Sequence, residues 1–242
     1  MDCSQITKLR EIISASERIV FFGGAGVSTE SGIPDFRSSS GIYNMKGQKI
    51  PPEEIVSHSF FTEHTAEFYD FYRKHLVYPD ALPNKAHLAL ARLEECGKLA
   101  AVITQNIDGL HQKAGSKTVY ELHGSVLRNY CLRCGKRYGV DKILSSDGVP
   151  VCSCGGVIRP DVVLYEEALD DEVIANAVSE IRKADTLIIG GTSLAVYPAA
   201  GLIYYFKGSN TVIINKSPTS ADSEADLVIS GPIGEVLDAA VG

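Results

Sequence analysis

Short apolar runs alternate along the chain with segments in which apolar residues recur every three or four positions. The runs are too short for helices and are bounded by polar residues or glycine, which is typical of strands buried on both faces of a sheet. We predict strands at residues 18–22, 99–104, 185–190, 210–214 and 226–229. Helical spacing predicts helices at residues 4–16, 60–76, 84–95, 170–183, 198–206 and 233–241. This alternation predicts an α/β fold with a doubly wound, mostly parallel sheet.

Two stretches interrupt the alternation and indicate a second, smaller domain inserted into the first. Residues 38–52 are rich in Ser, Gly, Pro and Lys and lack periodicity, so we expect a loop that closes over a ligand. A later stretch carries four cysteines. We expect the larger domain at residues 1–37, 84–125 and 160–242, a loop and helical part of the smaller domain at 38–83, and its zinc ribbon at 126–159.

The composition is that of a globular protein, since 45% of the 242 residues are apolar and 22% are charged. The first ten residues are polar and no run of 18 apolar residues occurs, so we predict neither export nor a membrane span and expect a cytoplasmic location. A net charge of −7 gives no general attraction to nucleic acid. Residues 126–160 carry six Lys or Arg against two Asp, a formal +4. Solvated side chains around a metal site explain this local charge, with a nucleic-acid patch as the alternative.

The strongest local signal is a quartet of cysteines in two close pairs, Cys131 with Cys134 and Cys152 with Cys154. Two such pairs, with 17 residues between them, suit a tetrahedral Zn²⁺ held by four thiolates. Four sulfur ligands leave no position for substrate or water, so we expect a structural metal. A redox dithiol is the alternative.

A glycine-rich turn, Gly24-Ala25-Gly26, follows the first predicted strand. Such a turn lets the backbone approach a pyrophosphate, and the start of a following helix adds N–H donors. Thr29 stands where a dinucleotide-binding fingerprint has its third glycine. A tight strand-to-helix turn without a ligand is therefore the alternative.

Further polar residues follow turns and strand ends. After Pro34, the residues Asp35, Phe36 and Arg37 suit a pocket in which Arg37 binds a phosphate or carboxylate and Phe36 excludes water; a Phe plug beside an Asp–Arg pair is the alternative. Three groups lie at the ends of later strands: Gln105 to Asp108, Gly190 to Ser193 and Asn215 to Ser217. Ligands of open α/β sheets bind at these ends. For Asn106 and Asp108 the alternative is an Asx turn that caps the next helix.

Among the six histidines, His123 has the best context for catalysis. It ends the strand-like stretch T-V-Y-E-L, precedes Gly124 and stands before the cysteine quartet. An imidazole with a pKa of about 6.5 is a natural general base at neutral pH, although a structural histidine is the alternative. His111 falls in a helix, where we expect it to pack or cap.

In this order along the chain, the motifs resemble the sirtuin family of NAD-dependent protein deacylases, of bacterial type. The shared motifs are G-A-G-V-S-T-E-S-G-I-P-D-F-R, T-Q-N-I-D-G-L-H, E-L-H-G-S, the cysteine quartet, R-P-D-V-V and G-T-S-L. Each is modest alone, but together they are highly specific. The resemblance implies a Rossmann-type NAD-binding domain and a smaller domain with one structural Zn²⁺. It also implies that an acetyl-lysine protein or peptide meets NAD in the cleft between them.

The resemblance further implies roles for individual residues. His123 becomes the general base, with Asn106 as a second catalytic residue. Expected NAD contacts are Gly24, Ala25, Gly26, Thr29, Asp35, Phe36, Arg37, Gln105, Ile107, Asp108, Gly191, Thr192, Ser193, Asn215, Ser217 and Ile233. The substrate peptide should be flanked by Val163, Leu164 and Tyr165, in an extended stretch suited to pairing with a peptide backbone.

The implied reaction is deacetylation by displacement. The acyl carbonyl oxygen attacks the ribose carbon that bears nicotinamide, and nicotinamide leaves. His123 then helps to deprotonate a ribose hydroxyl, which attacks the alkylamidate that the displacement has formed. Water finally releases free lysine and O-acetyl-ADP-ribose. The alternatives are mono-ADP-ribosyl transfer, removal of other short neutral acyl groups, an NAD-dependent oxidoreductase and a nucleic-acid-binding zinc ribbon.

Two departures from the family pattern concern the substrate. After Leu164 the family often has an aromatic residue and then Gly-Glu, whereas this chain has Tyr165, Glu166 and Glu167. The missing glycine reduces backbone freedom and adds charge beside the peptide.

The second departure concerns the acyl group. Family members that remove succinyl or malonyl groups carry a Tyr-x-x-Arg pair, but here Tyr69 is followed at that spacing by Tyr72, with Arg73 one position later. On a helix this shift turns Arg73 about 100° away. We therefore expect short neutral acyl groups, acetyl foremost.

Overall fold

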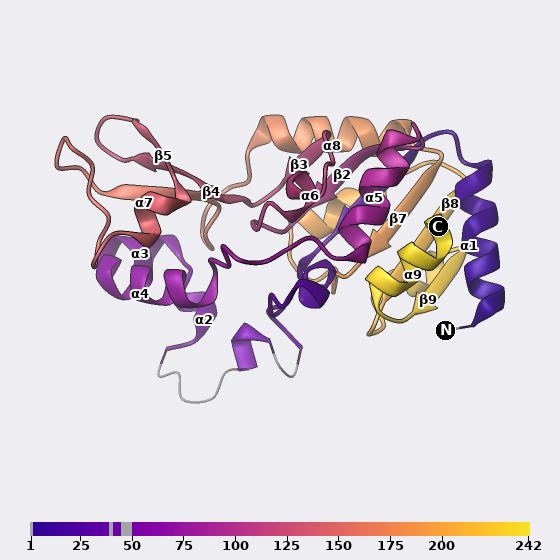
Figure 1. Ribbon diagram of the computed structural model, residues 1–242, viewed down its shortest axis with the longest axis horizontal. Helices are drawn as coiled ribbons and strands as arrows, with labels where there is room; N and C mark the ends of the chain where they lie inside the picture. Colours follow the sequence, from indigo (N-terminus) through magenta and orange to yellow (C-terminus); the bar gives the residue numbers. More distant parts are fainter. Residues whose placement is uncertain (1, 39–40, 45–49) are drawn as a thin grey trace.

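The computed structural model describes residues 2–38, 41–44 and 50–242. It has two lobes, a larger one around a six-stranded sheet and a smaller one around a three-stranded sheet and short helices (Figure 1). Both ends of the chain lie in the larger lobe (Figure 1). Within the described ranges, none of the helices has the length and apolar character needed to cross a membrane.

All six strands of the larger sheet run parallel, as the uninterrupted apolar runs predict. They are β1 (Ile19–Gly23), β2 (Leu99–Thr104), β3 (Val119–Glu121), β7 (Thr186–Gly190), β8 (Asn210–Asn215) and β9 (Leu227–Ser230). Their order is β3-β2-β1-β7-β8-β9, so the chain first builds outwards on one side of β1 and then on the other. This doubly wound order confirms the predicted fold class, and its change of direction opens a crevice at the carboxyl ends of β1 and β7.

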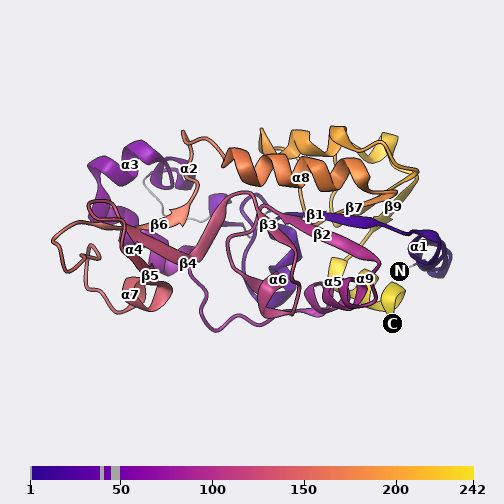
Figure 2. The same ribbon diagram turned by 90° about the horizontal axis from the view of Figure 1, so that it is seen from above.

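Helices cover both faces of this sheet (Figure 2). On one face lie α1 (Cys3–Ala15), α5 (Lys85–Glu95) and α9 (Ile233–Val241). On the other lie α8 (Asp171–Lys183) and the 3-10 helix η4 (Ala199–Tyr205). Because successive side chains of a strand point to opposite faces, β1 contributes Phe21 to one core and Phe22 to the other.

The smaller lobe combines the helical part of the chain after residue 50 with the cysteine-bearing stretch. Its antiparallel sheet has the order β5-β4-β6. The strands are β4 (Gly124–Cys131), β5 (Arg137–Gly139) and β6 (Ile158–Val162), and the helices are α2 (Pro52–Ile55), α3 (His58–Glu63), α4 (Thr65–His75) and α7 (Val140–Leu144). Aromatic rings fill its core: Phe61 and Phe68 meet edge to face with centroids 5.0 Å apart.

Several predicted helices differ in detail from the structure. The helix predicted at 60–76 is divided into α3 and α4 at His64, whose φ of −128° and ψ of 45° are not helical. The helix predicted at 198–206 is the 3-10 helix η4, and the glycine turn leads into two 3-10 helices, η1 (Ala25–Val27) and η2 (Thr29–Ser31). The remaining short helices are η3 (Ile42–Asn44), α6 (Leu110–Lys113) and η5 (Asp222–Glu224). Part of the loop predicted at 38–52 lies outside the described residues.

Candidate active site

A cavity of about 750 Å³ lies at the carboxyl ends of β1, β2, β7 and β8 and extends to the smaller lobe. Its walls include every residue for which we predicted a catalytic, NAD or peptide contact. The sequence positions are far apart, and the crevice between β1 and β7 brings them together. The four cysteines, all within the described part of the chain, are not among the lining residues.

The glycines of the first turn allow two strand-end loops to touch. A Cβ on Gly26 would lie 2.8 Å from the Cα of Gly191, and a Cβ on Gly24 would lie 2.9 Å from the Cβ of Thr192. The Gly26 N–H also donates to the Gly191 carbonyl at 2.8 Å. The close packing of the loops therefore accounts for the glycines whether or not a pyrophosphate lies beside them.

A buried hydroxyl that the sequence reasoning missed joins two predicted site residues. The Ser28 hydroxyl donates to the Asp108 carboxylate at 2.6 Å and accepts from the Asn106 side-chain amide at 3.0 Å. The other Asp108 oxygen accepts from the Leu110 N–H at 2.9 Å, so the Asx cap of α6 coexists with this network. No periodicity or residue spacing in the sequence singles out Ser28, which lies four residues after Gly24.

A second set of hydrogen bonds connects the ends of β2, β7 and β8. The Gln105 side-chain amide donates to the Thr192 hydroxyl at 3.1 Å, and the Asn215 amide donates to the Thr192 carbonyl at 3.1 Å. The Asn215 amide also donates to the Ser217 carbonyl at 2.8 Å. These bonds fix three strand-end loops as one polar wall.

His123 is held by a single backbone acceptor. Its Nδ1 lies 2.9 Å from the Gln105 carbonyl oxygen, and because a carbonyl only accepts, Nδ1 carries the proton. In the neutral ring Nε2 is then the basic nitrogen. Burial lowers the pKa of His123 below 6.5, although the hydrogen bond to Gln105 opposes this shift. A neutral imidazole that can accept a proton therefore lines the cavity at neutral pH.

Two other histidines form a buried pair outside the cavity lining. The rings of His87 and His111 are 4.7 Å apart, and both residues are at most 1% exposed. Burial lowers the pKa of His111 to about 3 and that of His87 to about 4. His111 packs in the core, as predicted.

The residues after Pro34 form an aromatic cover near the cavity. The Phe36 and Tyr43 ring centroids lie 5.4 Å apart, and the Arg37 guanidinium lies 5.3 Å from the centre of the Tyr43 ring. Asp35 instead accepts from the backbone N–H at position 38, at 2.8 Å. Asp35 and Arg37 thus contact different partners. The alternative drawn from the sequence had paired these two side chains with each other. The Tyr43 hydroxyl lies 2.6 Å from that of Tyr165, which connects this cover to the expected peptide segment.

The backbone N–H groups of the expected peptide segment are already bonded within the chain. Val163 donates to the His123 carbonyl at 3.0 Å, Leu164 to the Glu167 carboxylate at 2.9 Å and Tyr165 to the Val56 carbonyl at 3.0 Å. A peptide that lies along this segment therefore meets its carbonyl and side-chain groups.

The four cysteine sulfurs lie in a compact cluster in the smaller lobe. They are all within 4.8 Å of one another, with Cys131 and Cys154 at 3.5 Å and Cys134 and Cys152 at 3.7 Å. A tetrahedral zinc with Zn–S bonds of about 2.3 Å needs sulfurs roughly 3.8 Å apart. None of the four is in a disulfide. Their arrangement and chemistry fit a closed structural zinc site.

Tyr72 and Arg73, the residues at and next to the position of the family's acyl-binding arginine, are not among the residues that line the cavity. The Arg73 side chain donates to the carbonyls of Ile143 and Gly148, near the zinc-bearing part of the smaller lobe. Tyr72 is fully buried in the aromatic core. Arg73 is therefore committed to backbone carbonyls rather than to an acidic acyl group.

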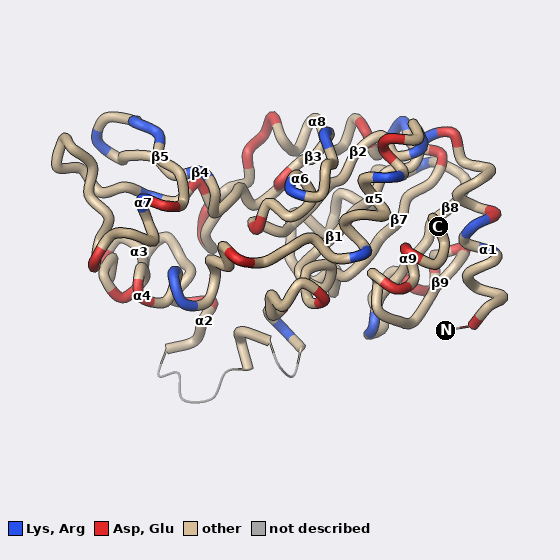
Figure 3. Tube along the Cα trace, viewed as in Figure 1, with Lys and Arg blue, Asp and Glu red and all other residues tan. Residues whose placement is uncertain are grey.

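The positive charge of the smaller lobe is partly neutralised by acids from outside residues 126–160. Arg128 pairs with Glu121 at 2.6 Å and with Asp161 at 3.0 Å, and Arg159 pairs with Glu167 at 2.5 Å. Figure 3 shows basic residues near β5 and acidic residues spread over both lobes. This distribution favours solvated side chains over a nucleic-acid patch.

Comparisons with known proteins agree with this geometry. A family model described as "Sir2 family" matches residues 24–198. A protein of Clostridium perfringens named "NAD-dependent protein deacetylase" is 65% identical over 96% of this chain and 97% of its own. One of the same name from Clostridium acetobutylicum is 58% identical over 98% of each.

Solved structures resemble the whole chain. A Sir2 histidine-to-alanine variant, in complex with deacetylated p53 peptide and 3'-O-acetyl ADP ribose, has a TM-score of 0.89 at 40% identity over 97% of this chain and 96% of that one. A complex of Sir2 with p53 peptide and NAD⁺ has a TM-score of 0.84 at 41% identity, covering 98% and 96%.

Proposed function

The chain belongs to the Sir2 family, and on this basis we propose that it is an NAD-dependent protein lysine deacetylase. It transfers the acetyl group of acetyl-lysine to ADP-ribose and releases nicotinamide, O-acetyl-ADP-ribose and free lysine. The observation that best supports this reaction is the single cavity that joins a neutral histidine, the Ser28–Asp108 network and three strand-end loops.

NAD, when bound, supplies the ADP-ribosyl group and its nicotinamide leaving group. We assign the glycine turn, Thr192 and Asn215 to its phosphates and ribose, since these loops are already fixed by hydrogen bonds. Asn106 and Asp108 hold the nicotinamide end through the network of Ser28. Phe36 and its neighbouring rings exclude water from the reacting centre.

His123 acts as the general base. Its Nδ1 proton is held by the Gln105 carbonyl, so Nε2 accepts the proton of a ribose hydroxyl. Low solvent exposure keeps the ring neutral and ready to accept a proton. The neighbouring Val163 N–H donates to the His123 carbonyl, which fixes the base relative to the peptide segment.

The partners are proteins or peptides that carry acetyl-lysine, with the peptide flanked by Val163 to Tyr165. A solved structure of a Sir2 complex with p53 peptide and NAD⁺ supports a peptide substrate. The engagement of Arg73 with backbone carbonyls supports a short neutral acyl group. Three proposals come from the sequence. They are the domain ranges given above, a structural role for the four-cysteine zinc site and a cytoplasmic location.

The test is to incubate the protein with an acetyl-lysine peptide, with and without NAD. We expect deacetylated peptide and nicotinamide in equal amounts by mass spectrometry, only when NAD is present. Absorbance at about 340 nm should not change, because no hydride is stored. An unchanged peptide would contradict the proposal.

A further inference from the structure

Glu166 has a backbone conformation that residues with a side chain rarely adopt. Its φ is +74°, in the left-handed region. It is the third residue of a turn closed by the Glu167 N–H, which donates to the Leu164 carbonyl at 3.1 Å. A positive φ at this position of a turn normally selects glycine or asparagine. An unfavoured residue persists in such a place only when its surroundings hold it there.

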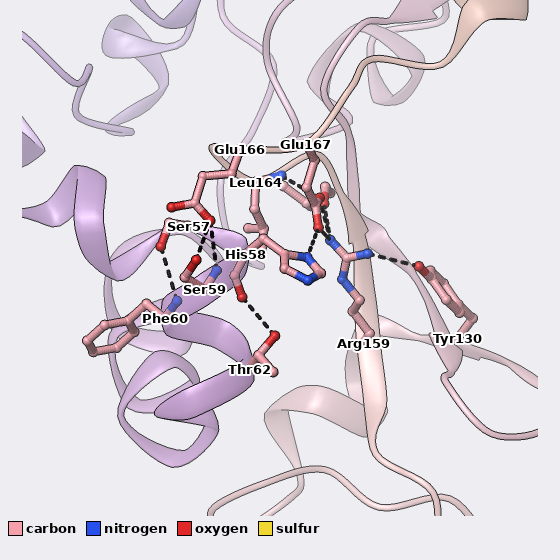
Figure 4. A network of polar contacts seen from close by, with 11 residues as sticks. Ser57, His58, Ser59, Phe60, Thr62, Tyr130, Arg159, Leu164, Glu166 and Glu167 are labelled. Carbon is pink, nitrogen blue, oxygen red and sulfur yellow. Dashed lines mark hydrogen bonds and ion pairs between the residues drawn. The ribbon is translucent and has the colours of Figure 1, made fainter.

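The carboxylate of Glu166 supplies this support by binding the first turn of α3. One of its oxygens accepts from the Ser59 backbone N–H at 2.9 Å and from the Ser59 hydroxyl at 2.7 Å (Figure 4). These bonds hold the pKa of Glu166 below its ordinary value, so the group is ionised at neutral pH. Glycine at this position would adopt the turn easily but would make neither bond.

Glu167 anchors the same turn from its other side. Figure 4 shows the two neighbouring carboxylates bound to different partners, Glu166 to Ser59 and Glu167 to Arg159 and His58. The Glu167 carboxylate accepts two bonds from the Arg159 guanidinium, at 2.5 and 2.6 Å, and lies 2.7 Å from His58 Nδ1. The turn is thus tied to α3 by Glu166 and to β6 by Glu167.

The anchored turn continues directly into the peptide segment. Tyr165 donates to the Val56 carbonyl and its own carbonyl accepts from the His58 N–H, each at 3.0 Å. At the other end of the segment, the Val163 N–H donates to the carbonyl of His123. A shift of the turn relative to α3 would therefore move the peptide-flanking residues relative to the catalytic base.

We propose that Glu166 is a positioning residue for the peptide: through Ser59 it anchors the turn that presents Val163 to Tyr165 to the acetyl-lysine substrate. The proposal rests on the proposed function for the identity of that substrate. Glu166 acts through the segment and not on the reacting atoms, so its effect belongs to peptide binding more than to the chemical step.

The test compares Glu166→Gly, Glu166→Gln, Ser59→Ala and the double variant Glu166→Gly/Ser59→Ala in steady-state kinetics. Glu63→Gln, which removes an exposed charge from the same helix, is the matched control. We expect Glu166→Gly to raise the peptide KM about 5- to 20-fold, because peptide binding must then order a segment that the two Ser59 bonds no longer hold. The NAD KM and kcat at saturation should change less than about twofold, and the melting temperature should stay close to that of the wild type.

Glu166→Gln and Glu63→Gln should keep a peptide KM close to that of the wild type, because the glutamine amide oxygen can still accept from Ser59. The double variant should match Glu166→Gly, because Ser59 acts only through Glu166. An unchanged KM in Glu166→Gly would overturn the proposal. A KM that rises in Glu166→Gln for peptides with basic flanks, but not in Ser59→Ala, would also overturn it, since the carboxylate would then be contacting the peptide directly.

Hydrogen exchange separates this proposal from the deacetylase reaction itself. If the wild type fails to turn over acetyl peptide, the proposed function is wrong, but the anchor is still tested. The amides of Tyr165 and His58 should exchange faster in Glu166→Gly than in the wild type. Equal exchange at both amides would overturn the anchor.

Discussion

At His123 one backbone carbonyl decides which ring nitrogen is basic. The Gln105 carbonyl holds the Nδ1 proton, and burial favours the neutral ring, so both effects prepare Nε2 to accept a proton. Sequence context marked this histidine as a candidate because it follows a strand-like stretch and precedes the cysteine quartet, and its role as a base stays a prediction. Ser28 was missed because a single serine in a glycine turn carries no periodic or spacing signal.

We expect His123→Ala to lower kcat about 10²- to 10⁴-fold, the usual contribution of a general base. Folding and NAD binding should be largely retained, as measured by circular dichroism and calorimetry. His64→Ala, at an exposed histidine of the smaller lobe, is the control and should keep normal turnover. Wild-type rates in the His123 variant would show that the base lies elsewhere.

The pH dependence of kcat/KM follows from the lowered pKa of His123. The neutral ring is the active form, so activity rises with pH through the pKa of the free enzyme and is full above it. Because burial lowers this pKa, the midpoint of the acidic limb should lie below 6.5. A midpoint above 6.5 in the pH–rate profile would contradict the assignment.

Among the elements, strands were predicted more accurately than short helices. The apolar runs that became β1, β2 and β7 are buried almost throughout, and β8 and β9 each contribute buried residues, so their hydrophobicity marks them directly. The break at His64 was not visible in the sequence, since helical periodicity continues across it. The left-handed Glu166 was likewise hidden, because the Ser59 bonds that support it come from a helix more than 100 residues away in sequence.

Zinc should hold the smaller lobe together, because its ligands come from the strand β4 and from two loops. We expect Cys131→Ser to lose zinc and unfold this lobe. Cys96→Ser, at an exposed cysteine after α5, is the matched control and should keep one zinc per chain. Elemental analysis and hydrogen exchange of β4 to β6 measure both effects, and stoichiometric zinc in the Cys131 variant would show that the ligands are wrong.

The Tyr43–Tyr165 hydroxyl contact connects the cover near Phe36 to the peptide segment. Tyr165→Phe removes one hydroxyl and keeps the ring. We expect the KM for NAD to rise about two- to fivefold, in line with one neutral hydrogen bond of about 1 kcal/mol. Tyr205→Phe, at an exposed tyrosine on η4, is the control. An unchanged KM for NAD would show that the contact does not hold the cover in place.

For the whole molecule, the site depends on contacts that no local pattern reveals. Motifs could be assigned to strand ends, but only the strand order β2-β1-β7-β8 shows that their loops meet at one crevice. The buried histidine pair lies outside the cavity, but no local pattern reveals it either, since α5 supplies His87 and α6 supplies His111. His87 also accepts from the Asn84 N–H, so the pair joins the start of α5 to α6.

This pair predicts a loss of stability in mild acid. Both folded-state pKa values are lowered from 6.5, to about 4 and about 3, so their contribution is complete above pH 6.5 and is lost as pH falls. Between pH 7.5 and pH 5 the free energy of unfolding should drop by up to about 2 kcal/mol per histidine. Urea denaturation across this range measures the drop. His111→Leu should flatten the pH dependence. His123→Ala measures the separate contribution of His123, whose pKa burial also lowers.

The fate of the acetyl group tests the account as a whole most directly. A peptide with a ¹³C-labelled acetyl-lysine is incubated with NAD, and the products are separated by mass spectrometry. We predict that the label appears in O-acetyl-ADP-ribose, in the same amount as free nicotinamide and deacetylated peptide. Label in free acetate from the first turnover, or ADP-ribose attached to protein while the peptide keeps its acetyl group, would contradict it.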